Sequence, residues 1–103
     1  MLEYVFDKTI YFLENMPKSV RKKKGQFFTS VETATYMAKM FDLTGLPTLV
    51  NILDPGCGTG ILSAALIDRL QQETNIKEAF LTCYETDIDI IPILRSNLNY
   101  IKE

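Results

Sequence analysis

The stretch from Thr48 to Gln72 constrains the fold of this chain more than any other part of its sequence. TLVNILD is a short apolar run with β-branched residues, PGCGTG is rich in glycine, and ILSAALIDRLQQ predicts a helix. A strand, a glycine-rich loop and a helix in this order open a βαβ unit. We therefore expect a parallel sheet of the α/β class.

The sequence after this stretch supports the same class. A polar linker leads to a second apolar run, AFLTCYE, and TDIDIIPILRSNLNYI then predicts another helix, with Pro92 in its first or second turn. Right-handed crossovers place such successive strands side by side. The predicted fold is α/β, with N-terminal helices followed by the first two βα units of a parallel sheet.

Two helices are predicted before the first strand. Apolar residues at spacings of three and four over residues 2–13 predict an amphipathic helix that ends near Asn15. A second helix, capped by Thr29 or Ser30, is expected to end near Asp42. The chain therefore divides into an N-terminal helix, a basic loop and an α/β domain, which span residues 1–16, 17–30 and 31–103.

Composition excludes several classes of protein. With 47% hydrophobic and 23% charged residues, the chain has the composition of a globular domain and not of a disordered segment. It contains no His, which excludes His-based triads and zinc fingers, and we expect no metal site. Its two Cys, without a secretion signal, are expected to be reduced thiols of a cytoplasmic protein. No apolar stretch approaches the ~20 residues that cross a bilayer, so we expect no membrane partner.

Positive charge is concentrated in one short run. The net charge is −2, yet five of the eleven basic residues fall within seven positions: Lys18, Arg21, Lys22, Lys23 and Lys24. The remaining chain carries six basic residues against thirteen acidic ones. This distribution suggests a local contact with an anion and not a surface that coats nucleic acid, and a solvated loop explains the run equally well on charge alone.

Both predicted strands end in residues suited to a ligand site, because ligands bind at the carboxyl ends of parallel strands. The first strand ends at Asp54, and Gly56, Gly58 and Gly60 then let the backbone turn tightly and approach a ligand. The second strand ends in Glu85, Thr86 and Asp87. Glu85 follows Gly60 by 25 positions, close to the ~20-residue interval at which an acid accepts hydrogen bonds from ribose hydroxyls. These features together predict a nucleoside-containing ligand.

The charged residues near the loop restrict the class of possible ligands further. No Lys-Ser or Lys-Thr pair follows the glycines, which disfavours a phosphate-binding loop of the Walker type. The Asp54 carboxylate would repel a polyphosphate and favours a cationic or hydroxyl-bearing ligand. S-adenosylmethionine suits both acids, because Glu85 would accept bonds from the adenosine hydroxyls and Asp54 would lie near the sulfonium and the ammonium.

Three motifs resemble those of a known family. DPGCGTG resembles the first motif of class I S-adenosylmethionine-dependent methyltransferases, and YETD resembles their acidic second motif. KKKGQFFTSVETATYMAKMFD resembles the GQFFTP-type segment of restriction-modification adenine-N6 DNA methyltransferases, and its position before the first motif matches their γ-type order. Ser30 stands where that family usually has Pro. The resemblance covers residues 20–100 and implies a Rossmann-like sheet, here incomplete.

The resemblance also implies roles for individual residues. Thr29, with Phe27 and Phe28 beside it, would hold the methionine end of the cofactor. Asp54 and the glycine-rich loop would line the methionine and the ribose, Glu85 would bind the ribose hydroxyls, and Thr86 with Asp87 would border the adenine. The expected cofactor-binding residues are Phe27, Phe28, Thr29, Asp54, Gly56, Cys57, Gly58, Gly60, Glu85, Thr86 and Asp87. The two Phe also fit a hydrophobic staple before a helix, and Cys57 is interpreted as a small loop residue and not a nucleophile.

One part of the family pattern is absent from the sequence. These enzymes hold the target adenine with a motif of the Asn-Pro-Pro-Tyr kind, and none of the four prolines here is adjacent to another. The sequence ends after the second of about seven family strands, so we expect the N-terminal cofactor-binding portion, without catalytic residues and inactive alone. Leu49, Val50, Ile52 and Leu53 suit a strand covered on both faces, and its bare edge predicts self-association.

Two alternatives remain open at this stage. The chain could be a non-catalytic DNA-binding or assembly module, with Lys22, Lys23 and Lys24 as its contacts. It could instead belong to a methyltransferase for proteins or small molecules, because the first two motifs are shared across that superfamily. The segment from Gly25 to Thr29 favours DNA.

Overall fold

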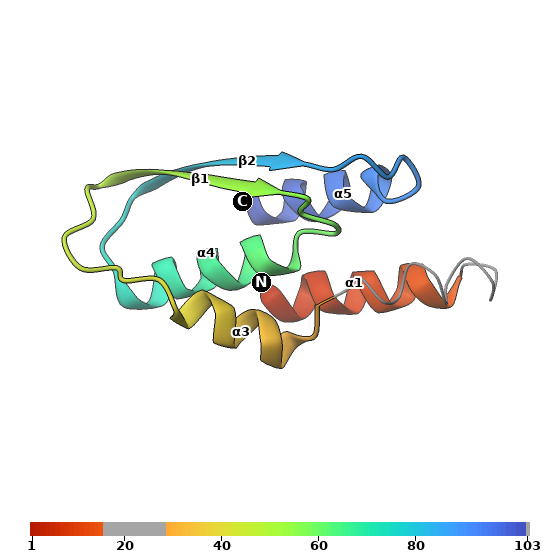
Figure 1. The fold of residues 1–103 in the computed structure, drawn as a ribbon, viewed down its shortest axis with the longest axis horizontal. Helices are drawn as coiled ribbons and strands as arrows, with labels where there is room; N and C mark the ends of the chain where they lie inside the picture. Colours follow the sequence, from red (N-terminus) through yellow and green to blue (C-terminus); the bar gives the residue numbers. More distant parts are fainter. Residues whose placement is uncertain (16–28, 103) are drawn as a thin grey trace.

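The computed structural model describes residues 1–15 and 29–102. In chain order its elements are α1 (Leu2–Glu14), α3 (Val31–Lys39), β1 (Leu49–Pro55), α4 (Ile61–Glu73), β2 (Glu78–Tyr84) and α5 (Ile91–Lys102) (Figure 1). This order is the predicted one. The expected site residues Phe27 and Phe28 and the basic residues Lys22, Lys23 and Lys24 lie outside the described residues. No helix in the described ranges is long and apolar enough to cross a membrane.

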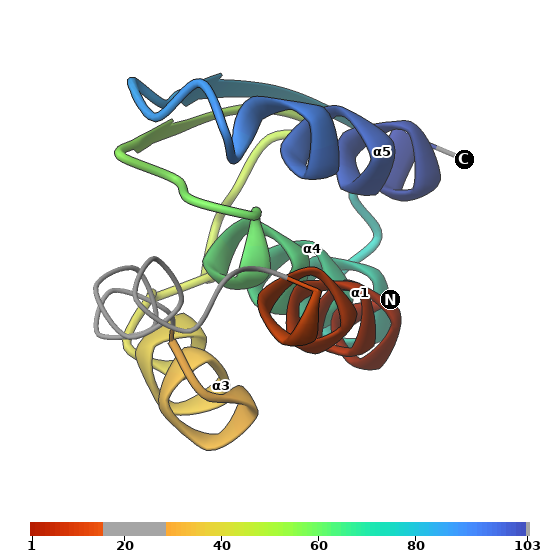
Figure 2. The same ribbon diagram turned by 90° about the vertical axis from the view of Figure 1, so that its right-hand side faces the viewer.

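The two strands form one parallel sheet. They pair in register from Leu49 opposite Glu78 to Pro55 opposite Tyr84. The helices lie on one side of this sheet, with α4 between the sheet and the α1 and α3 helices (Figures 1 and 2). The predicted α/β class, with N-terminal helices and two βα units, is confirmed, and it is compatible with an incomplete Rossmann-like sheet.

Side chains of β1 alternate between a covered and a bare face. Val50 and Ile52 point toward the helices and pack with Leu66 and Leu70 of α4. On the other face, Leu49, Leu53, Phe80 and Tyr84 are exposed by 42%, 64%, 60% and 62%. The prediction that β1 is covered on both faces is therefore wrong for the described chain. The α4 helix connects the two parallel strands, and α5 follows β2 on the same side of the sheet (Figures 1 and 2).

The main core lies among the helices and not against the sheet. Its buried members are Leu2, Val5, Ala34, Ala38, Ile61, Ala64, Ala65 and Ile101. Alanines on the facing sides of α3 and α4 leave little side-chain bulk between the two helices. This arrangement brings the start of α3 close to the start of α4.

Polar contacts fix α1 and α3 against α4. The backbone N–H of Leu2 donates to the Asp68 carboxylate at 2.8 Å, which satisfies one of the free amides in the first turn of α1. Arg69 donates from Nη1 to the carbonyl oxygens of Ala38 at 2.8 Å and Phe41 at 2.6 Å. Arg69 thus binds one carbonyl in the last turn of α3 and one just beyond the helix, which ends at Lys39 instead of near Asp42.

Two helix starts are explained by side chains. The Ser30 hydroxyl accepts the N–H of Thr33 at 3.1 Å and caps α3, so Ser30 is the cap of the two predicted candidates. The last helix starts at Ile91, five residues later than predicted, because Asp87 forms a turn before it. Pro92 is its second residue, where a missing N–H costs little.

Candidate functional site

The glycine-rich loop turns the chain from the end of β1 into α4. Gly56, Gly58 and Gly60 have φ values of 64°, 57° and 92°, in the left-handed region that strains residues with a Cβ. No atom lies within 4 Å of the position that a Cβ would take at Gly56 or Gly58. The backbone of the loop therefore borders open space in which a ligand could approach it.

That open space is a small cavity of about 160 Å³. It is lined by Thr29, Asp54, Pro55, Gly56, Cys57, Gly58, Thr59, Ile61 and Leu62. Five of the expected cofactor residues meet here, and Thr29 comes from a segment 25 positions before Asp54. Gly60, the N-cap residue of α4, is buried and does not line the cavity. Free N–H groups at the start of α4 add a partial positive charge beside the loop.

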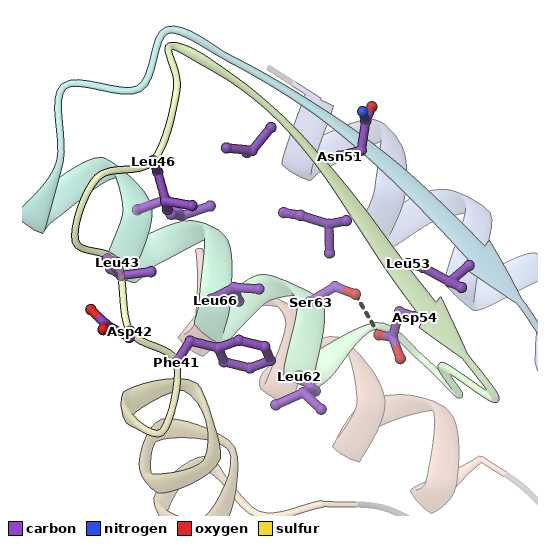
Figure 3. A pocket seen from close by; sticks show the side chains of 13 residues that line it. Phe41, Asp42, Leu43, Leu46, Asn51, Leu53, Asp54, Leu62, Ser63 and Leu66 are labelled. Carbon is purple, nitrogen blue, oxygen red and sulfur yellow. Dashed lines mark hydrogen bonds between the residues drawn. The ribbon is translucent and has the colours of Figure 1, made fainter.

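Asp54 is oriented by a residue that the sequence interpretation missed. Ser63, on the first turn of α4, donates a hydrogen bond from Oγ to Oδ2 of Asp54 (Figure 3). Ser63 is 2% exposed, and Asp54 is half-buried. The signal in the sequence was a single hydroxyl within the apolar run ILSAALI. A carboxylate held in this way presents a fixed negative charge at the wall of the cavity.

The acids that follow β2 lie next to the loop but outside the cavity. The N–H of Cys57 donates to the carbonyl of Tyr84 at 3.0 Å, which joins the loop to the end of β2. Glu85 comes next and is half-buried, whereas Thr86 is exposed. The Asp87 carboxylate accepts the N–H of Asp89 at 3.0 Å in the turn before α5. The expected site thus forms two adjoining groups, one around Asp54 and one after β2.

Burial controls the chemistry of the loop cysteine. Desolvation, together with the neighbouring Cys83 thiol and the Asp54 and Glu85 carboxylates, raises the pKa of Cys57 to about 12. Burial also raises the pKa of Cys83. Both cysteines are free thiols. Because the thiolate is the reactive form, a protonated Cys57 agrees with its interpretation as a small loop residue.

Alkylation tests this assignment. At pH 8 we expect iodoacetamide to modify Cys57 at least tenfold more slowly in the folded chain than in urea, because the raised pKa keeps the thiol protonated. Peptide mass spectrometry over a time course measures the two rates. Modification of Cys57 in the folded chain as fast as in urea would contradict the assignment.

A second, larger cavity of about 250 Å³ adjoins the first (Figure 3). It lies between β1, α4 and the loop after α3, on the side of β1 away from β2. Its walls are mainly apolar, and its lining comprises Phe41, Asp42, Leu43, Leu46, Val50, Asn51, Ile52, Leu53, Asp54, Leu62, Ser63, Leu66 and Leu70. Asp54 and Leu62 line both cavities, so the two hollows meet at the carboxyl end of β1.

Comparison with known proteins matches nearly the whole chain to one family. The model of the family described as N-6 DNA Methylase matches residues 6–101. Ribosomal RNA small subunit methyltransferase A of Mesomycoplasma hyopneumoniae is 36% identical over 95 residues, which are 85% of this chain and 32% of that protein. The type II methyltransferase M.BsuBI of Bacillus subtilis is 35% identical over 83 residues, 81% of this chain and 16% of that protein.

The chain therefore spans about a third and about a sixth of the lengths of these two relatives. No solved structure matches it significantly. Both matched relatives are methyltransferases by name, one of ribosomal RNA and one of type II.

Proposed function

The chain belongs to the N-6 DNA methylase family, and from this we propose that it is the S-adenosylmethionine-binding part of an adenine-N6 DNA methyltransferase. The observation that carries the proposal is the 160 Å³ cavity, in which Thr29 of the GQFFT segment meets Asp54 and the glycine-rich loop. Each of the two motifs alone has a structural explanation. Their convergence on one open cavity favours a shared ligand.

The residues present fit this cofactor. Open space in front of Gly56 and Gly58 leaves room for a ligand against the backbone, and Ser63 fixes the Asp54 carboxylate beside that space. In the proposal, Thr29 and Asp54 hold the positively charged methionine end, and Glu85 binds the ribose hydroxyls. Gly60 shapes the loop, and Thr86 with Asp87 borders the adenine. When bound, the cofactor supplies an electrophilic methyl group on a sulfonium.

Thermal unfolding tests the proposed ligand. A ligand that binds only the native state stabilises it, by about 2.7 kcal/mol when its concentration is 100 times the Kd. We expect S-adenosylmethionine to raise the Tm of the full chain, and ATP at the same concentration to leave it unchanged. ATP shares the adenosine group but carries a polyphosphate that the Asp54 carboxylate repels. Equal shifts of the Tm with S-adenosylmethionine and with ATP would contradict the proposal.

DNA is the proposed substrate of the whole enzyme, as one component of a restriction-modification system. The family match and the type II relative support this assignment. RNA is the second candidate, because the other relative is named a ribosomal RNA methyltransferase. In the proposal, the basic residues Lys22, Lys23 and Lys24 contact the DNA backbone, and that binding weakens as salt concentration rises.

One motif of the family pattern is absent from these 103 positions. No Asn-Pro-Pro-Tyr motif occurs in the sequence, so nothing in it matches the residues that hold the target adenine in the family. We propose that this portion binds the cofactor and that transfer depends on further parts of the methyltransferase. By itself it is expected to transfer no methyl group to DNA.

We propose that the bare side of the sheet drives self-association. Within the described residues β1 and β2 each pair along one edge only, and Leu53, Phe80 and Tyr84 on the bare face of the sheet expose 64%, 60% and 62% of their surface. Unpaired strand edges next to apolar surface attract other strands. At high concentration we expect dimers or larger species in sedimentation velocity.

Charged substitutions distinguish association through the bare side of the sheet from nonspecific hydrophobic association. Leu53→Lys combined with Phe80→Lys is expected to shift the chain to monomer, because like charges would face each other across the contact. Ile88→Lys serves as the matched control, since Ile88 is 78% exposed but lies outside the strands. A monomeric wild-type chain, or equal effects of both changes, would contradict self-association through the sheet.

A further inference from the structure

Three polar side chains from distant parts of the sequence meet behind the glycine-rich loop. They are Thr9 of α1, Thr59 of the loop and Asn97 of α5, exposed by 1%, 1% and 0%. The hydroxyl oxygens of Thr9 and Thr59 are 2.7 Å apart. Asn97 donates from Nδ2 to the backbone carbonyl of Thr59 at 2.9 Å. We call these three residues the loop clamp.

The available protons determine which hydroxyl donates in the hydrogen bond between Thr9 and Thr59. Thr9 Oγ1 lies 2.8 Å from the carbonyl of Val5, one turn earlier in α1. A hydroxyl carries one proton, so with Thr9 donating to Val5, the Thr59 hydroxyl is the donor to Thr9. Thr59 is therefore bound through its side chain by α1 and through its backbone by α5.

Thr59 is the residue through which the loop is held. Its neighbours Gly58 and Gly60 have left-handed φ values and no side chains to anchor them. Thr59 itself lines the 160 Å³ cavity on one side and contacts Thr9 and Asn97 on the other. A shift of Thr59 would move the backbone amides that border the cavity.

The composition of the loop clamp is unfavourable for stability alone. Position 97 continues the apolar spacing of Leu94 and Ile101 on the buried side of α5. Asn97 there leaves Oδ1 buried without a hydrogen-bond partner among the described residues. An unsatisfied buried acceptor costs free energy, and an apolar residue of the same size would avoid that cost. Holding the Thr59 carbonyl accounts for an amide at this position.

We infer that Thr9 and Asn97 are positioning residues, which act through Thr59 to keep the glycine-rich loop in the conformation that receives the cofactor. The inference rests on the proposed function for the identity of that ligand. It goes further in assigning a role in binding to α1 and α5, whose side chains Thr9 and Asn97 do not line the cavity.

Near-isosteric substitutions test the loop clamp. Thr9→Val and Asn97→Leu keep the number and branching of the side-chain heavy atoms and remove the hydrogen bonds to Thr59. Thr9→Ser keeps the hydroxyl and should therefore keep loop exchange and affinity at the wild-type level. Ile101→Val is the matched control, because Ile101 is a buried residue of α5 in the core with Leu2 and Val5. Hydrogen exchange of the amides of residues 57–60 measures the loop in the unliganded full chain, and titration with S-adenosylhomocysteine measures affinity.

We expect loop exchange to accelerate and the Kd to rise, each by about tenfold, in Thr9→Val and in Asn97→Leu. Thr9→Ser and Ile101→Val should resemble the wild type. Unchanged loop exchange in both variants, or faster exchange with unchanged affinity, would overturn the inference. An equal loss of affinity in Ile101→Val would also overturn it, because general destabilisation would then explain the effect. Faster loop exchange in the two variants, together with a wild-type chain that does not bind S-adenosylhomocysteine, would overturn the proposed function. The role of Thr9 and Asn97 in holding the loop would then stand.

Discussion

Asp54→Asn is expected to weaken the binding of S-adenosylmethionine by about thirtyfold. Loss of one charge from a partly buried, hydrogen-bonded pair costs about 2 kcal/mol or more, which corresponds to that factor. Asn keeps the shape of the side chain and can still accept the hydrogen bond from Ser63. The change therefore removes the negative charge and leaves the local packing in place. Isothermal titration calorimetry at fixed ionic strength measures the effect.

Asp42→Asn is the matched control for this prediction. Asp42 lines the larger cavity but not the one formed by the glycine-rich loop. The same chemical change there should leave the affinity within about twofold of the wild type, because exposed charges far from a ligand are screened. Similar losses of affinity in Asp42→Asn and Asp54→Asn would mean that net charge, and not the carboxylate at the cavity wall, governs binding.

Leu66→Ala is expected to lower the free energy of unfolding by about 2–3 kcal/mol, near the lower end for buried leucines. Leu66 is 8% exposed and packs with Val50 and Leu70 between α4 and β1. It also borders the larger cavity, so part of its surface already lacks close neighbours. Urea unfolding followed by circular dichroism measures the change, and the Tm should fall by about 4–8 °C per kcal/mol.

Leu53→Ala provides the contrast on the same sheet. Leu53 belongs to β1 but is 64% exposed on the bare face, so its removal should change stability by no more than about 0.5 kcal/mol. A large loss in Leu53→Ala would show that this face is covered in solution. It would then support self-association at the concentration used, and dilution should reduce the loss.

Local patterns in the sequence were sufficient to predict the elements around the loop. The strand, the glycine-rich loop and α4 occupy consecutive residues, so their order and the left-handed turns at Gly56 and Gly58 follow from nearby chemistry. The capped start of α3 at Ser30 was predictable for the same reason. The start of α5 was not, because the Asp87 turn competes with the helical pattern that follows it.

Contacts between distant segments could not be derived from these patterns. Thr9 falls in the apolar stripe of α1, although its hydroxyl binds Thr59. Ser63 and Asn97 likewise occupy helix positions whose neighbours are apolar. A polar residue at such a position signals a buried partner, but only the packing of α1, α4 and α5 identifies that partner. The bare face of β1 likewise depends on which side the helices occupy.

Calorimetric titration of the full chain with S-adenosylmethionine and S-adenosylhomocysteine tests whether this cavity binds the cofactor. We expect saturable binding of one ligand per chain, which is weakened by Asp54→Asn and by Glu85→Gln. Circular dichroism on the same samples establishes that each variant is folded. A folded wild-type chain that binds neither ligand would contradict the assignment of this cavity to the cofactor.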